Sequence, residues 1–289
     1  MSRTQRRAAA LFWVACEALG ASASAGAAPA SASESKPAPA SAASAASVAP
    51  ASGPWSLSPA EAGALRQALQ VLRVKTPSWD APRGTAQRYE RSAPAAPFRA
   101  VGPPLMVWVG RSGLAVRSDA AAAVGGAGPR KQEGDGRSPA GVLTLGSLWG
   151  YAEHPPVGVR LAYKTAGERD RCVDDADSPY YNQLTVQPAA GLPAWRSAES
   201  LRLPTDHYKY LIVLDYNTKV PQPGAGSCIF LHVAPPPGAP TAGCTALAEA
   251  DLLTVLRWLE PSRRPVLLQL PAPLLEPGGD GPIPAELRR

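Results

Sequence analysis

Proline is the residue that most constrains this sequence. It occupies 33 of 289 positions, about twice its usual share. A proline inside a helix removes a backbone hydrogen-bond donor and clashes with the preceding turn, so the chain cannot be mostly helical. We therefore expect long linkers and short strands joined by turns.

The first 55 residues contain little that could form a core. Arg3, Arg6 and Arg7 precede an apolar stretch at residues 8–16, and small residues follow it. This pattern predicts an export signal over residues 1–26. The Ala, Ser and Pro composition of residues 27–55 predicts a disordered N-terminal tether. The competing interpretation is one disordered, alanine-rich segment without a signal.

The charge of the chain argues against one class of partner. The formal net charge is +6, and the first 55 residues hold four basic and two acidic residues, which leaves +4 for the rest. These charges form no dense Lys/Arg run, so we expect no nucleic-acid partner. No later stretch reaches the roughly 20 apolar residues that a membrane span needs, so we expect none in the mature chain.

Residues 56–103 predict a short helix followed by a connector. Ser58 is a candidate N-cap, Pro59 suits the first helical position, and Glu61 completes a capping box. Leucines then recur at helical spacing through residues 65–74. Residues 75–103 carry many turn formers, which indicates a connector.

Short apolar runs dominate after residue 104. Five runs bounded by Gly, Pro or Asn predict strands at residues 105–109, 142–145, 210–214, 228–233 and 266–270. One long helix is expected at residues 251–259, before Pro261. We therefore predict a mainly β domain over residues 104–271, a mixed β-sandwich or barrel-like fold with one main helix, followed by a C-terminal tail at residues 272–289.

A cysteine and a histidine stand where they could do chemistry together. Cys244 follows a glycine, and a sharp turn there can aim the amides of Ala242 and Gly243 at one point, as an oxyanion hole requires. A thiol also needs a base, because little of it is thiolate at neutral pH. His232 ends an apolar run twelve residues earlier and is the candidate base. Taken alone, such residues are more often structural than catalytic.

Several segments, in the same order, resemble one family. Residues 226–232 (GSCIFLH) and 241–247 (TAGCTAL) are similar to the His…[Ser/Thr]-x-Gly-Cys signature of the L,D-transpeptidase (YkuD-type) catalytic domain. Residues 131–141 (KQEGDGRSPAG) resemble its Lys-x-Glu-Gly-Asp-x-x-Thr-Pro-x-Gly strand entry, and residues 172–182 and 195–199 resemble blocks of one branch. The resemblance spans residues 104–271 and makes the catalytic interpretation the favoured one.

The resemblance implies a cysteine acyltransferase. Cys244 would attack a peptidoglycan stem peptide between an L-centre and a terminal D-residue, and the thioester would pass to an amine acceptor. His232 would take the thiol proton and return one to the leaving amine. Stem peptides are then the expected partner, the periplasm or cell envelope the expected location, and a monomer the expected state. We expect no cofactor, and no metal either, because the sequence lacks Cys-x-x-Cys and His-x-x-x-His spacings.

Two positions depart from the family's pattern. Ala242 stands where many relatives have His, which leaves His232 without a competing base. Ala246 stands where many have Arg, which removes a possible contact to a substrate carboxylate. The alternatives are therefore a wall hydrolase (an L,D-carboxypeptidase or amide-cleaving enzyme) that passes the same thioester to water, and a noncatalytic wall-binding module. A papain-like protease is disfavoured, because its cysteine opens a long helix early in the chain.

The remaining candidates each have a structural alternative. An exported enzyme with a reactive thiol should avoid spare thiols, which predicts a Cys172–Cys228 disulfide, with two buried free thiols as the alternative. Asp174 and Asp175 are candidates for orienting His232 or receiving the acceptor amine, but such a pair more often caps a turn. Further candidate cleft residues are Tyr181, Asn182, Thr241 and Thr245.

Overall fold

A computed structural model of the chain describes residues 55–119, 128–276 and 283–289. The predicted export signal, and all but the last residue of the predicted tether, lie outside these ranges. Within them, every helix is too short or too polar to cross a membrane.

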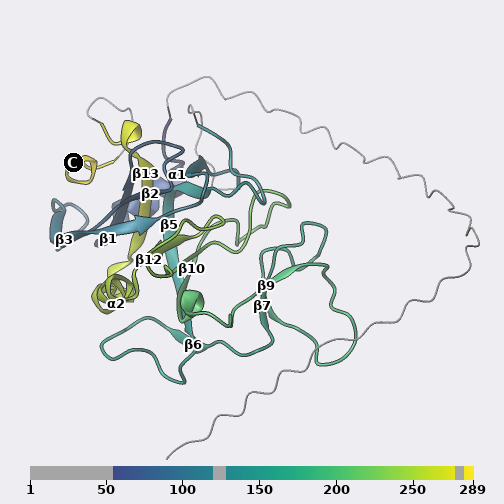
Figure 1. The fold of residues 1–289 in the computed structure, drawn as a ribbon. Helices are drawn as coiled ribbons and strands as arrows, with labels where there is room; N and C mark the ends of the chain where they lie inside the picture. Colours follow the sequence, from purple (N-terminus) through teal and green to yellow (C-terminus); the bar gives the residue numbers. More distant parts are fainter. Residues whose placement is uncertain (1–54, 120–127, 277–282) are drawn as a thin grey trace, which may run out of the picture. The chain divides into compact units, whose positions relative to one another are not determined.

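In the described part of the chain, ten strands form one sheet that closes on itself (Figure 1). The strand order is β10-β11-β12-β3-β2-β1-β13-β5-β4, with β6 beside β5. Because β10 also pairs with β5, the two ends of the sheet meet, and the predicted mainly β, barrel-like fold is confirmed. The strands are β1 (Gln70–Thr76), β2 (Arg83–Glu90), β3 (Arg99–Trp108), β4 (Leu114–Val116), β5 (Ser138–Gly150), β6 (Tyr163–Thr165), β10 (Tyr210–Leu214), β11 (Phe230–Val233), β12 (Thr245–Leu247) and β13 (Val266–Pro271).

A second, three-stranded sheet has the order β8-β7-β9. It consists of β7 (Asp170–Val173), β8 (Leu184–Val186) and β9 (Ala198–Ser200). The helices are α1 (Pro59–Gln67), α2 (Glu249–Trp258) and α3 (Ala285–Arg288), with short 3-10 turns η1 (Asp206–Tyr208), η2 (Pro261–Arg263) and η3 (Ala272–Leu274). The main helix predicted at residues 251–259 is α2, which begins two residues earlier.

The predicted capping box at the start of α1 is confirmed. The Ser58 hydroxyl accepts the Glu61 amide at 3.2 Å, and the Glu61 carboxylate accepts the Ser58 amide at 2.9 Å. The other Glu61 oxygen accepts the amide of Val142 in β5 at 2.9 Å. One buried carboxylate therefore starts the helix and also joins it to the main sheet.

The prediction of a connector over residues 75–103 is wrong. These residues contain β2 and parts of β1 and β3, and β1 pairs with β2 on one side and β13 on the other. Leu72, which has helical spacing in the sequence, is fully buried in β1. Six of the seven β1 residues are buried. A strand covered on both faces shows no alternation of apolar and polar residues, so the spacing of Leu72 from Leu65 and Leu69 fits a helix as well as a strand.

A bulge lets β3 accept two consecutive prolines. The pairing of β2 with β3 runs from Ala86↔Leu105 to Arg88↔Val101, so one strand has extra residues. These include Gly102, whose φ is 64°, followed by Pro103 and Pro104. A bulge leaves residues outside the hydrogen-bond ladder, where proline's missing donor costs nothing.

The predicted C-terminal tail belongs to the folded domain. Leu275, Ile283 and Leu287 are at most 5% exposed and belong to the same apolar cluster as Leu72. The interpretation of residues 272–289 as a tail is therefore wrong for the part that the structure describes. These residues pack on a core that begins as early as Trp55.

We expect Leu72→Ala to lower the free energy of unfolding by about 2–5 kcal/mol, because it leaves a cavity between two paired strands. Chemical denaturation of both proteins measures the difference. Leu192→Ala is the matched control, since Leu192 is 96% exposed and should change stability by less than about 0.5 kcal/mol. Equal effects at the two positions would contradict the central placement of β1.

Candidate active site

Cys244 and His232 line the same cavity. Its volume is about 620 Å³, and Tyr208, Glu199 and Asp174 also line it. The two reactive side chains are well covered, with 7% of Cys244 and 6% of His232 exposed. The cavity is therefore the place where both can meet a substrate.

Two neighbouring parallel strands bring these residues together. Leu231 pairs with Thr245 and His232 with Ala246. Cys244, just before β12, is therefore level with Phe230 at the start of β11. Successive side chains on a strand alternate between faces, so His232 lies on the Phe230 side, two positions further along. The proline-rich loop between the strands returns the chain to the start of β11.

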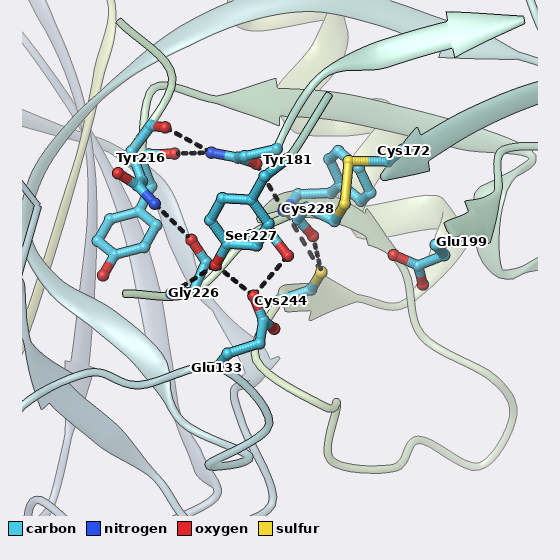
Figure 2. Close-up of a disulfide and its surroundings, with 12 residues drawn as sticks. Glu133, Cys172, Tyr181, Glu199, Tyr216, Gly226, Ser227, Cys228 and Cys244 are labelled. Atoms are coloured by element: carbon cyan, nitrogen blue, oxygen red, sulfur yellow. Dashed lines mark hydrogen bonds between the residues drawn. A yellow bond between two sulfur atoms is a disulfide. The ribbon is translucent and has the colours of Figure 1, made fainter. Parts of the chain in front are cut away.

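The Cys244 sulfur sits between two backbone groups. It accepts a hydrogen bond from the Phe230 amide at 3.3 Å and donates one to the Cys228 carbonyl at 3.4 Å (Figure 2). The first contact stabilises a thiolate, because the amide is a donor. The second holds a thiol proton, because a carbonyl accepts only.

Hydroxyl groups fix the turn that carries Cys244. The Cys244 carbonyl accepts from the Ser138 hydroxyl at 2.7 Å and from the Thr241 hydroxyl at 2.5 Å. The Thr241 hydroxyl also accepts the Gly243 amide at 3.1 Å. Thr241, Ala242 and Gly243 all line the cavity. The Gly243 amide thus already has an acceptor and would have to exchange it for an oxyanion.

His232 has one ring nitrogen held by a backbone carbonyl. Its Nδ1 lies 2.9 Å from the Val233 carbonyl. A carbonyl can only accept, so Nδ1 carries the proton and Nε2 is the unprotonated nitrogen of the neutral ring. Burial lowers the pKa of His232 to about 4. The imidazole is therefore neutral at neutral pH.

Burial also keeps the Cys244 thiol protonated. It raises the pKa of the thiol, and the negative charge of Glu199 raises it further. The Phe230 amide and the charge of Lys131 act in the opposite direction but are weaker. The resting pair is therefore thiol and imidazole, without an ion pair.

A disulfide joins the second sheet to the segment before β11. The hypothesised Cys172–Cys228 bridge is present, with a Cα–Cα distance of 5.9 Å. Cys228 has a φ of 54°, which is not a strand conformation. The strand predicted to begin at residue 228 therefore begins at Phe230. Since the Cys228 carbonyl contacts the Cys244 sulfur, the bridge acts directly on the surroundings of the nucleophile.

Tyr181 and Asn182 hold the segment before β11 through hydrogen bonds. The Asn182 side chain accepts the Cys228 amide at 2.8 Å and donates to the carbonyls of Tyr216 and Asn217. The Tyr181 hydroxyl donates to the Glu133 carboxylate, which also accepts from Ser227 (Figure 2). Neither Tyr181 nor Asn182 is among the residues that line the cavity.

The two neighbouring aspartates have different surroundings. Asp175 accepts the amides of Asp177 and Arg196 and forms an ion pair with Arg196, and these contacts hold the pKa of its carboxyl well below the usual range. This is the turn-capping arrangement. Asp174 lines the cavity instead, and its Oδ1 is buried without a hydrogen-bond partner among the described residues.

Thr245 lies in the core, away from the cavity lining. It is fully buried, and its hydroxyl donates to the Gln269 side chain at 2.8 Å. Ala246 is fully buried and packs with Trp108 and Ala234. Within the described residues, no group of three or more His, Cys, Asp or Glu side chains is arranged to hold a metal ion.

Three residues that contact Cys244 or its neighbours are not among those predicted from the sequence. Tyr208 packs its ring edge against His232 at a centroid distance of 5.1 Å, and its hydroxyl donates to Glu199. Glu199 lies directly opposite Cys172 in the pairing of β7 with β9. Ser138 was detectable, because it occupies the threonine position of the Thr-Pro-x-Gly pattern. No spacing in the sequence relates Tyr208 or Glu199 to Cys244.

Comparison with known families gives one match. Residues 104–268 match the model of the YkuD family, described as the L,D-transpeptidase catalytic domain. A search of curated proteins and a search of solved structures both found no match. The matched range includes β4 to β12, Cys244, His232 and every residue that lines the cavity.

We expect removal of the disulfide by Cys172→Ser with Cys228→Ser to destabilise the protein by about 2–4 kcal/mol, because the bridge closes a loop between residues 56 positions apart. Denaturation with and without reductant measures this. Reductant should weaken the wild type but leave the double variant unchanged. An equal response in both proteins would mean that the bridge is absent.

We expect His232 to make the protein less stable in acid. Its folded pKa, about 4, lies below the unfolded value of about 6.5, so the unfolded chain binds the proton first between these values. Stability should then fall by about 3 kcal/mol relative to His232→Gln as the pH drops from about 6.5 to 4. Parallel stability curves for the two proteins across this window would contradict the burial of a neutral imidazole.

Proposed function

Because the chain belongs to the YkuD-type L,D-transpeptidase family, which acts on peptidoglycan, we propose that it is a cysteine transpeptidase for peptidoglycan stem peptides. Cys244 is the nucleophile and His232 the base. One observation carries the proposal: a thiol directly before β12 and an imidazole on the neighbouring parallel strand β11 line one cavity.

The first half-reaction forms a thioester. His232 Nε2 takes the thiol proton as the sulfur attacks the carbonyl carbon between an L-centre and a terminal D-residue. The C–N bond breaks, and the imidazolium returns its proton to the leaving amine. In the second half-reaction, an acceptor amine loses a proton to His232, attacks the thioester carbonyl and releases the Cys244 thiol.

The neutral thiol of Cys244 and the neutral imidazole of His232 suit these two half-reactions. Charge separates only while the sulfur attacks, when the Phe230 amide can stabilise the sulfur and the turn at residues 241–244 faces the carbonyl oxygen. We assign the oxyanion contact to backbone amides of this turn, including those of Ala242 and Gly243. Because the thiol stays protonated at rest, the enzyme avoids the oxidation to which a standing thiolate is prone.

Hydrolysis of the same thioester is the second candidate function. Position 246, where many relatives carry an arginine, holds a fully buried alanine packed with Trp108 and Ala234. A contact from this position to an acceptor's carboxylate is therefore missing. Water as the acceptor would make the enzyme a carboxypeptidase or amide-cleaving hydrolase of the wall.

The cellular setting follows from the substrate. Stem peptides lie outside the cytoplasmic membrane, so we propose that residues 1–26 export the chain and that residues 27–55 tether a monomeric catalytic domain in the periplasm or cell envelope. A protein that retains the wild-type N-terminus should then be recovered from the envelope fraction in a shortened form.

Defined muropeptides incubated with the mature protein and analysed by mass spectrometry test the activity. We expect cross-linked dimers for transfer and shortened monomers for hydrolysis. Cys244→Ala should abolish turnover, and His232→Ala should lower it by about 10² to 10⁴, the usual size of a general-base effect. Thr254→Ala, at a half-buried position of α2 outside the cavity lining, is the control and should react normally. A lack of product with intact Cys244 would favour a wall-binding module.

A further inference from the structure

Tyr208 contacts the other groups that surround the nucleophile. Its ring lies edge-on to those of Phe230 and His232, at centroid distances of 5.7 Å and 5.1 Å. Its hydroxyl donates a hydrogen bond to Glu199. Tyr208 also belongs to the same buried cluster as Cys244, and donation from its hydroxyl lowers the pKa of the thiol. The proposed reaction leaves both Tyr208 and Glu199 without a role.

The hydroxyl of Tyr208 has two acceptors and one proton. A phenol can donate only one hydrogen bond, so it serves either the Glu199 carboxylate or the sulfur. An ionised carboxylate can only accept, whereas a protonated carboxyl group can donate. The protonation state of Glu199 therefore decides which acceptor the tyrosine serves.

Glu199 is placed to change protonation state near neutral pH. Burial raises the pKa of its carboxyl to about 7, and the negative charges of Asp174 and Glu133 add to this effect. Tyr208 is the group that opposes them, by donating to the carboxylate. Lys131, which also lines the cavity, acts on the Cys244 thiol and favours the thiolate.

We propose that Glu199 is a positioning residue that switches the Tyr208 hydroxyl between two acceptors and thereby sets the reactivity of Cys244. The idea rests on the proposed function, since it concerns the same nucleophile. When Glu199 is protonated, its O–H donates to the tyrosine oxygen, and the tyrosine donates to the sulfur. When Glu199 is ionised, it holds the hydroxyl, and its charge opposes a thiolate.

Glu199 and Cys244 then share a single negative charge. Loss of one proton from the pair produces mainly the carboxylate, with a small fraction of thiolate. Two negative charges joined through one hydroxyl in a buried site oppose each other, so the second proton leaves only at much higher pH. Once Glu199 is ionised, a further rise in pH no longer increases the thiolate fraction.

The rate of Cys244 alkylation by iodoacetamide, followed across pH by mass spectrometry of the Cys244 peptide, tests this without any substrate. We expect the wild-type rate to rise about tenfold per pH unit up to about pH 7 and then to level off. Glu199→Gln should keep rising, because its amide donates to Tyr208 at every pH. At pH 9 it should react at least about tenfold faster than the wild type.

Combined variants separate the switch from simple charge repulsion. Tyr208→Phe keeps the ring contacts but removes the hydroxyl, so it should react more slowly than the wild type at pH 6. If Glu199 acts through the tyrosine, adding Glu199→Gln to Tyr208→Phe should restore little of the rate at pH 9. Equal gains in both backgrounds would contradict the switch, because the effect would then be electrostatic repulsion alone.

Glu168→Gln is the matched control. Glu168 is a surface residue whose side chain is 82% exposed and pairs with Arg202, so its variant should follow the wild-type profile. Circular dichroism verifies that each variant is folded. A wild-type profile that rises without levelling off overturns the proposal even if muropeptides are cross-linked. A profile that levels off in a protein without turnover overturns the proposed function instead.

Discussion

The parallel pairing of β11 with β12 is the contact on which the rest of the site depends. It sets Cys244 level with Phe230, so that the Phe230 amide meets the sulfur, and it places His232 two positions further on the same side. A slip of one residue would turn the thiol to the opposite face. The hydroxyls of Ser138 and Thr241 hold the Cys244 carbonyl and so help to prevent that slip.

Burial explains why Cys244 and His232 are both uncharged in the absence of substrate. Removing a thiol and an imidazole from water disfavours the charged form of each, which raises one pKa and lowers the other. An ion pair would need compensating charges, and Glu199 has the wrong sign to favour a thiolate. The site is therefore built to delay charge separation until a substrate carbonyl can accept it.

Local patterns in the sequence were sufficient for parts of the structure. The capping box at Ser58, the five predicted strands and helix α2 each depend on residues close together in the chain. Strand β1 was missed because it is buried on both faces, so its sequence carries no alternation. Its single leucine, Leu72, continues the helical spacing of Leu65 and Leu69, and only the pairing of β1 with β2 and β13 decides between helix and strand.

The same reasoning explains which site residues were found. Cys244 and His232 are twelve positions apart in a recognisable pattern. Tyr208 and Glu199 reach the cavity from η1 and β9, and their relation to the nucleophile depends on how the second sheet packs. Asp174 and Asp175 are adjacent in sequence, yet one lines the cavity and the other caps a turn. That difference comes from backbone direction, which composition does not reveal.

The second sheet therefore contributes residues that act on Cys244. β7 carries Cys172, whose bridge fixes Cys228. The Cys228 carbonyl in turn accepts a hydrogen bond from the Cys244 thiol. β9 carries Glu199 directly opposite Cys172. The disulfide thus holds a carboxylate and a carbonyl, both acting on Cys244, in one rigid unit. Since an electrostatic effect in a buried site depends strongly on distance, a covalent link at this point fixes the distances on which the pKa of the thiol depends.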